Sequence, residues 1–419
     1  MTDRVITLIH DTSAAALFLA VMLLLVSAAT CGKLASLARL PKVTGEILGG
    51  FLLGPSLFGR FFPDFYERVF FGFEGQGFSL SVIYWLGLVF LMFSSGYDSN
   101  FVDAGKDRKI IAWLTAGATI LPFALGYIAS DLWFADYYIG EAGNRAVFNI
   151  IIAIITTVSS LPVISRIFMD LGLINHRFAR IVLATGTVQG LILWVILSAA
   201  TSLASTGQAV LSGIAVNITV TLAMFAFAML AMPRIRGSKL LDRTPFLPYD
   251  SLVLVVCFLF IYIGGLFNVS IMYSAFVAGM VYKNALRKDA VASHTKIKEV
   301  SSAFFIPVYF AIVGLRIYVD GGFSVSRFLF FLAIVSALEL GGCVLAMKCI
   351  KLGWLPSFNL GVAMNARGGP GIVVASIALD LGIINYEFFC VLVFVVLITS
   401  AIAGYWIGFI NKKGKLLPE

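Results

Sequence analysis

The chain has 419 residues, of which 60% are hydrophobic and only 12% are charged. This composition lies outside the range of soluble globular domains and leaves no room for a large soluble domain. A net charge of +8 does not require nucleic acid, because positive cytoplasmic loops give a membrane protein the same excess. We therefore expect a membrane protein that contacts anionic lipids and binds no nucleic acid.

Thirteen apolar stretches follow one another along the chain, and most can form a helix of about 20 residues, enough to cross the hydrocarbon core. They predict an all-α polytopic membrane protein with about 13 transmembrane helices, in a single domain over residues 1–419. The predicted spans are 13–32, 44–59, 79–97, 110–130, 146–169, 179–203, 209–232, 251–267, 270–284, 301–319, 325–347, 356–380 and 386–410.

Lys and Arg alternate from loop to loop between dense and sparse, and positive residues collect in cytoplasmic loops. One set of loops carries 23 of the 30 Lys and Arg, and the opposite set carries 6. The remaining one, Arg367, lies inside the twelfth span. The alternation places the N-terminus outside and the C-terminus in the cytoplasm. We expect an integral protein of a bacterial inner membrane.

The odd number of spans predicts an inverted repeat. If the seventh span (about 209–232) is a linker, helices 1–6 (about 13–203) and 8–13 (about 251–410) begin on opposite sides. Transporters built this way place the substrate near the midplane, at helices that Gly or Pro interrupts. The fifth span carries such a break at 156–162 (TTVSSLP), and the twelfth carries one at 365–371 (NARGGPG). Although Pro and Gly also kink ordinary membrane helices, the matched pair beside an intramembrane Arg favours a transport site.

Four segments along the chain carry a more specific pattern: 41–59 (PKVTGEILGGFLLGPSLFG), 87–98 (GLVFLMFSSGYD), 159–173, and 364–374 (MNARGGPGIVV). They resemble the monovalent cation:proton antiporter-2 family, which belongs to the sodium/proton exchangers. The resemblance implies a sodium/proton-antiporter fold with two interrupted crossing helices, and a scaffold or dimerisation domain beside a moving core. It also implies a homodimer that is no enzyme but a secondary transporter exchanging Na⁺ or K⁺ for protons.

The sixth span departs from the family at the position where the resemblance implies an Asp that binds cation and proton in turn. The span reads LATGTVQGL over 183–191 and contains no carboxylate. The acidic position falls on Gln189 or Gly190. A Gln can offer a carbonyl oxygen to a cation, but it cannot exchange a proton near neutral pH.

Glu339 lies in the middle of the eleventh span, where many relatives place a Lys. A carboxylate inside a membrane helix costs roughly 2.5–3.5 kcal/mol on insertion scales, so it is normally kept for a partner or a transported ion. We interpret Glu339 as an acid that takes over from the missing Asp by loading and releasing protons. The alternative is a structural ion pair with Arg367.

The remaining candidates surround the two breaks. Arg367 cannot lose its proton, so inside the membrane it needs a counter-charge, carbonyl oxygens or an anion. Thr157, Ser159 and Asn365 offer neutral oxygens suited to a partly dehydrated cation, although hydroxyls also bond to their own helix. Glu46 in the second span is a further carboxylate, for which transport and packing are equal alternatives.

Three functions remain open from the sequence. The first is a Na⁺ or K⁺ exchanger that uses relocated carboxylates, and the second is a transporter of another solute, such as an anion drawn to Arg367. The third is a membrane subunit that senses or anchors and moves nothing. No Cys or His spacing indicates a metal site, so we expect no cofactor and no metal beyond a transported cation. Few residues follow Phe409, so we expect no soluble regulatory domain.

Overall fold

The computed structural model describes residues 11–417 except 39, 99–106, 207–210, 232–247, 268, 286–294 and 320–322. Within these ranges the chain is almost entirely helical, with one isolated β-bridge between Ile139 and Ile384. The all-α membrane fold is therefore confirmed. Several charges used to predict orientation, including Arg4, Arg39 and Lys106, lie outside the described residues.

A helix is present at every predicted span, but the count of thirteen crossings is not confirmed in full. Seven of the described helices are long and apolar enough to cross a membrane, and the bent pair α18 (Trp354–Met364) and α19 (Gly369–Asp380) makes an eighth. The other apolar helices are shorter, as at Arg145–Thr157 and Asp250–Leu266. Of the predicted linker at 209–232, the described part is helical from Leu211.

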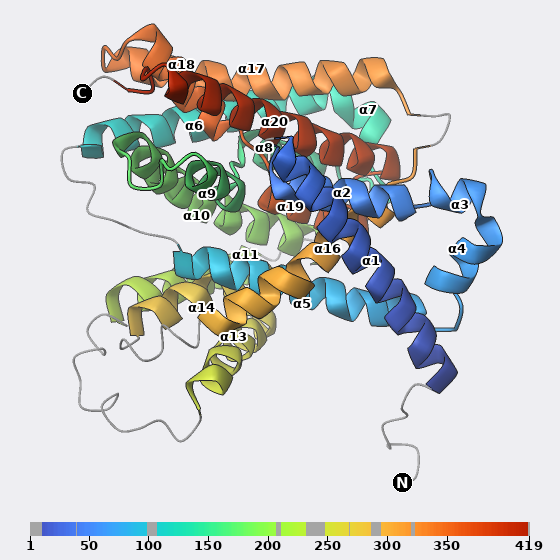
Figure 1. Ribbon diagram of the computed structural model, residues 1–419. Helices are drawn as coiled ribbons and strands as arrows, with labels where there is room; N and C mark the ends of the chain where they lie inside the picture. The colour runs from blue at the N-terminus through green and yellow to red at the C-terminus, as the bar shows by residue number, and fades with distance from the viewer. Residues whose placement is uncertain are drawn as a thin grey trace.

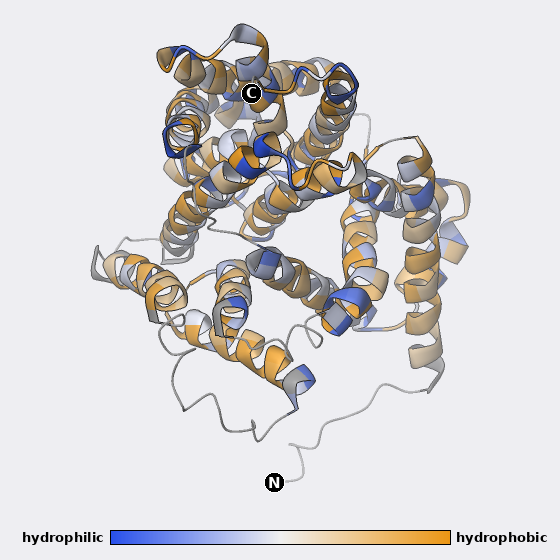
Figure 2. Ribbon diagram, turned by 60° about the vertical axis from the view of Figure 1, so that its left-hand side comes forward, coloured by the Kyte–Doolittle hydropathy of each residue, from blue (hydrophilic) through white to orange (hydrophobic). Residues whose placement is uncertain are grey.

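The helices pack into two bundles (Figure 1). The first contains α1 (Asp11–Leu37), α2 (Lys42–Leu53), α5 (Gln76–Asp98), α11 (Leu211–Ala226), α13 (Tyr249–Leu266), α14 (Ile271–Ala285) and α16 (Ile306–Leu315). The second contains α6 (Arg108–Ala129), α8 (Arg145–Thr157), α9 (Leu161–Asp170), α10 (Arg177–Thr206), α17 (Val325–Cys349), α18, α19 and α20 (Tyr386–Lys412). Apolar residues run along the helices of both bundles, as Figure 2 shows, so lipid can contact their outer sides.

Glycines let the helices of the first bundle touch backbone to backbone. A Cβ atom on Gly50 of α2 would lie 1.8 Å from the carbonyl oxygen of Ala311 in α16. One on Gly45 would lie 2.1 Å from the carbonyl oxygen of Cys31 in α1. No larger residue fits at these distances, so close packing explains the small residues of the second span.

Both predicted breaks are present, and both lie in the second bundle. The chain is extended at 158–160, between α8 and α9, and the pair α18 and α19 bends by 45° between Met364 and Gly369. A Pro opens the half-helix after each break, where its missing N–H leaves no helical hydrogen bond unmade. The sequence therefore predicted both interruptions correctly.

Candidate ion site at the crossing of two broken helices

The two breaks lie against each other and are joined by hydrogen bonds. The backbone N–H of Ser160 donates to the carbonyl oxygen of Ala366 at 2.8 Å. The Ser159 hydroxyl donates to the carbonyl oxygen of Met364 at 2.6 Å. Polar backbone groups freed inside a membrane protein must find partners there, and here each break supplies partners to the other. The crossing gathers the ends of four half-helices in one place.

Arg367 is 1% exposed, and its guanidinium lies at the C-terminal end of α8. Its Nη1 donates to the carbonyl oxygen of Ile155, and its Nη2 donates to those of Thr156 at 2.7 Å and Val335 at 3.4 Å. The free carbonyls at the end of a helix carry partial negative charge, which a fixed cation neutralises. Carbonyl oxygens thus partner both Nη groups of this buried charge, and its Nε has no partner in the described structure.

Glu339 is a buried carboxyl on α17, with 1% of its surface exposed. Neither of its oxygens makes a hydrogen bond of full geometry in the described part of the chain, although the side chain of Gln189 lies close enough to act on it. Arg367 acts on it electrostatically, but the two side chains form no ion pair in this structure. A buried carboxylate without a partner is costly, so Glu339 must be either protonated or associated with a cation.

The α17 turn just before Glu339 accepts hydrogen bonds from the second break. The Asn365 side-chain amide donates to the hydroxyl of Ser336 at 3.3 Å, and Arg367 reaches the carbonyl of Val335. Glu339 follows these two α17 residues by three and four positions, so it shares their face of the helix. The side-chain oxygen of Asn365 also has no partner among the described residues. Two kinds of unpaired oxygen therefore lie at the second break.

Gln189, at the position of the expected Asp, is neutral and forms hydrogen bonds to three backbone groups. Its Nε2 donates to the carbonyl oxygens of Ala118 in α6 and Thr157 in α8, both at 2.8 Å. Its Oε1 accepts from the backbone N–H of Ser159 at 3.3 Å. The hydroxyl of Thr157 bonds back to Ala153 of its own helix at 2.7 Å. Gln189 therefore holds the first break in shape, whereas the Thr157 hydroxyl is already used within its own helix.

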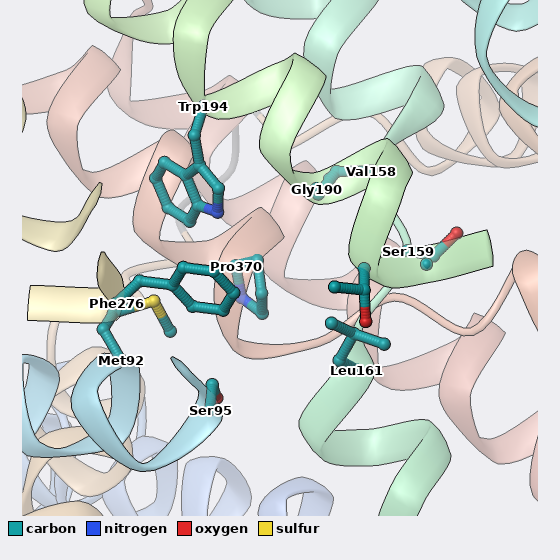
Figure 3. Close-up of a pocket in the computed structure, with 11 residues that line it drawn as sticks. Met92, Ser95, Val158, Ser159, Leu161, Gly190, Trp194, Phe276 and Pro370 are labelled. Atoms are coloured by element: carbon teal, nitrogen blue, oxygen red, sulfur yellow. The ribbon is translucent and has the colours of Figure 1, made fainter. Parts of the chain in front are cut away.

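Gly190, the next residue, lines a small pocket of about 20 Å³ beside the first break, together with Ser159, Thr187 and Pro370. Figure 3 shows the ring of Trp194 on the opposite side of this pocket from Ser159. A pocket of this size has room for about one water molecule or a bare ion. A Cβ atom built on Gly190 would meet no atom within 4 Å, so a longer side chain has space there.

A larger cavity of about 290 Å³ lies between the two bundles and shares Ser95, Leu161 and Thr187 with the small pocket. Its charged lining comes from the side predicted to be cytoplasmic: Lys42, Glu46, Asp98, Arg166 and Lys298. Glu339 does not line either of these two cavities, so in this conformation neither cavity reaches its carboxyl group.

Glu46 lies in this larger cavity and not at the crossing. It is 3% exposed and forms an ion pair with Lys42, one turn earlier in α2, at 3.2 Å. Arg166 of α9 also acts on it electrostatically. The structure therefore brings together Glu339, Arg367, Gln189 and the polar residues of the two breaks, and it leaves Glu46 in the first bundle with its own partner.

Sequence reasoning missed Ser336 and Ser400. The Ser400 hydroxyl of α20 donates to the backbone carbonyl of Arg367 and helps to hold the second break. Neither serine lies beside a Gly or Pro break of its own helix, so no local pattern indicates its role. Only the packing of α17 and α20 against the break reveals it.

Comparison with known proteins shows the family to which this chain belongs. A family model described as "Sodium/hydrogen exchanger, transmembrane" matches residues 21–413. The chain therefore belongs to this family of membrane transporters, and the resemblance found in its motifs is confirmed.

Relatives of this chain include K(+)/H(+) antiporter 1 of Saccharomyces cerevisiae, 28% identical over 87% of this chain and 43% of that one. The Na(+)/H(+)-K(+) antiporter GerN of Bacillus cereus is 24% identical over 92% and 94% of the two chains. The Na(+)/H(+) antiporter NhaS4 of Synechocystis is 27% identical over 94% and 97%. The chain thus spans less than half of the yeast relative and nearly all of the other two.

A solved structure supports the same fold. The sodium proton antiporter MjNhaP1 of Methanocaldococcus jannaschii aligns with a TM-score of 0.61 and 16% identity, over 96% of this chain and 100% of that one. The sodium/proton-antiporter fold is therefore confirmed.

Proposed function

We propose that this protein exchanges a monovalent cation, Na⁺ or K⁺, for protons across a membrane, and that Glu339 binds the two in turn. Its relatives are named as Na⁺/H⁺ and K⁺/H⁺ antiporters. The observation that carries the proposal is the buried Glu339 carboxyl, which makes no hydrogen bond of full geometry in the described structure. Either a proton or a cation would remove its charge, and each would do so only when the other has left.

The other groups at the crossing support this role because their charge does not change with pH. Arg367 cannot deprotonate, and Gln189 is neutral at every physiological pH. One carboxyl that alternates between a proton and a monovalent cation carries one positive charge in each direction. The exchange at this site is then one for one and electroneutral. Asn365, whose side-chain oxygen is unpaired in the described structure, would supply a neutral oxygen to the cation's shell.

Of the nitrogen donors of Arg367, only Nε is without a hydrogen-bond partner in the described structure, which is a narrow basis for binding an anion. Both Nη groups of its guanidinium already donate to backbone carbonyls of α8 and α17. An anion would have to replace these bonds and leave the carbonyls unpaired inside the membrane, which is costly.

We further infer that the helices over 13–203 and 251–410 are inverted repeats joined by the linker at 209–232. The first bundle would be the scaffold that dimerises, and the second, with both breaks, would be the moving core. The alternation of Lys and Arg supports an external N-terminus and a cytoplasmic C-terminus in a bacterial inner membrane.

Flux measurements in proteoliposomes test the proposed function. A pH-sensitive dye inside the vesicles would report how fast Na⁺, K⁺ or choline outside dissipates an imposed pH gradient. We expect Na⁺ or K⁺ to be active, and Glu339→Gln to slow the exchange about 100-fold or more. Glu387→Gln, on the outer end of α20, is the matched control and should keep the rate. If no ion dissipates the gradient in the wild type, the protein is not an exchanger, and an active Glu339→Gln would assign the proton to another acid.

A further inference from the structure

One ion pair crosses from the first bundle to the second on the side predicted to be outside. The Arg316 side chain, directly after α16, donates from Nη2 to Oδ1 of Asp380 at 2.7 Å. Asp380 is the last residue of α19, the half-helix that follows the second break. The side chains are 31% and 46% exposed, so water reaches the pair. The pair therefore joins the end of a scaffold helix to the end of a core half-helix.

Five other ion pairs of the described structure each lie within one bundle. Arg145 pairs with Asp131 and Asp136, and Arg327 pairs with Glu387, all within the second bundle. On the opposite side of the membrane, Lys298 pairs with Asp98 and Lys296 pairs with Asp250, both within the first bundle. These pairs can stay intact when the bundles move, whereas the pair between Arg316 and Asp380 cannot.

Two buried tyrosines, Tyr84 and Tyr309, lie near this pair, between the bundles. The rings of Tyr84 in α5 and Tyr309 in α16 have centroids 5.0 Å apart. Ser376, one turn before Asp380 in α19, lies against Tyr84 and is 2% exposed. The hydroxyls of Tyr309 and Ser376 are buried beside the hydroxyl of Tyr84, and neither makes a hydrogen bond of full geometry in the described structure. Polar groups in this state would gain hydrogen bonds if water entered.

The interface between the bundles is thus open on one side and closed on the other. The cavity of about 290 Å³ opens it from the side of Lys42 and Lys298 and continues to the pocket at Gly190. On the side of Arg316, the ion pair and the tyrosines fill the same interface. Access from one side at a time is what an exchanger requires, because a path open at both ends would leak ions.

We propose that Arg316 and Asp380 form a latch that closes the outer side of the path between the bundles and opens once in each transport cycle. The latch rests on the proposed exchange function. An exposed ion pair is weak and screened by salt, so it suits a contact that must break repeatedly. The hydroxyls of Tyr309 and Ser376 beneath it would then face the water that enters.

Cysteine labelling tests the latch without measuring transport. In a variant without its five native cysteines, Ser376→Cys reports access from outside, using a membrane-impermeant maleimide on right-side-out vesicles. Arg316→Asp places two carboxylates together, and we expect it to speed labelling about tenfold, since like charges repel where opposite charges attracted. The double variant R316D/D380R restores an ion pair and should restore slow labelling.

Arg327→Asp is the matched control, because it breaks an outer ion pair within one bundle. It should leave labelling slow. The latch is refuted if Arg316→Asp labels as slowly as the parent, if the charge swap fails to restore protection, or if Arg327→Asp speeds labelling equally. The amount of folded protein in each vesicle preparation, measured by size-exclusion chromatography, excludes a folding defect. Labelling that follows these expectations in a protein without flux would contradict the exchange proposal and the transport cycle, and it would leave only a contact between Arg316 and Asp380 that closes the outer side of the interface.

Discussion

The guanidinium of Arg367 donates a hydrogen bond of 2.7 Å to the carbonyl oxygen of Thr156, across the point where two broken helices meet. This bond makes Arg367 a built-in cation at the end of α8. The nearby carboxyl of Glu339 is left without an ion pair in the described structure, and we propose that a proton or a transported cation meets its charge in turn. A fixed cation and an unpaired acid are thus the two halves of the site.

Replacing Arg367 with Met should destabilise the protein strongly. The carbonyls of Ile155 and Thr156 would lose their donor inside the membrane, at about 1–3 kcal/mol for each unpaired group. Arg367→Lys keeps the charge but not the planar fork, so it should fall between Met and the wild type. Thermal unfolding in detergent measures the effect, with the exposed Arg60→Met as control. An Arg367→Met protein with the wild-type Tm would show that these bonds contribute little.

An acid placed at Gly190 should rescue the loss of Glu339. Gly190 lines the small pocket, and a side chain there has open space. If the coupling acid of this chain has been relocated, Glu339→Gln combined with Gly190→Asp should regain pH-dependent exchange. We expect at least about a tenfold gain over Glu339→Gln alone, since a correctly placed proton-transfer group contributes 10²–10⁴-fold. Gly190→Asn, of the same size without the charge, is the control and should not rescue; equal recovery with Asn would argue against an acid at this position.

Protons and cations should compete for Glu339. Protonation removes the negative charge that attracts the cation, so the KM for Na⁺ or K⁺ should rise as the pH falls. When the proton occupies most of the sites, the expected rise is about tenfold for each pH unit. Initial rates at several pH values and cation concentrations give the KM. A maximal rate that changes with pH while the KM stays constant would speak against a shared site.

The close contact between α2 and α16 should not tolerate a methyl group. Gly50→Ala would place its Cβ atom 1.8 Å from the carbonyl oxygen of Ala311, so the helices must separate. We expect a cost of about 1–3 kcal/mol, seen as a lower Tm in detergent. Gly341→Ala in α17, where an added Cβ meets nothing within 4 Å, is the control and should not lower the Tm. Equal Tm values for the two variants would mean that α2 can shift without loss.

Hydropathy and turn chemistry made much of this fold predictable. The eleventh span was expected at 325–347 and is found at Val325–Cys349, because its apolar run has clear polar ends. Pro370 and its neighbouring glycines marked the second break for the same local reason. Such signals lie within a few residues of the feature that they predict.

Long-range contacts could not be predicted in this way. Gln189 bonds to Ala118, 71 residues away, and Arg316 bonds to Asp380, 64 residues away. The sequence pattern identified Gln189 as a replacement for an acid, but not that its amide is tied to backbone carbonyls. The free space at Gly190 depends on the packing of α5, α9, α14 and α19 around α10, and no local pattern records it.

Proton release upon cation binding tests the role of Glu339 most directly. Purified protein in a lightly buffered detergent solution with a pH dye would be mixed with Na⁺, K⁺ or choline. We predict that Na⁺ or K⁺ displaces about one proton per chain from the wild type, as expected for one shared carboxyl, and none from Glu339→Gln. Undiminished release from Glu339→Gln would contradict the account, because the exchanged proton would then reside on another group.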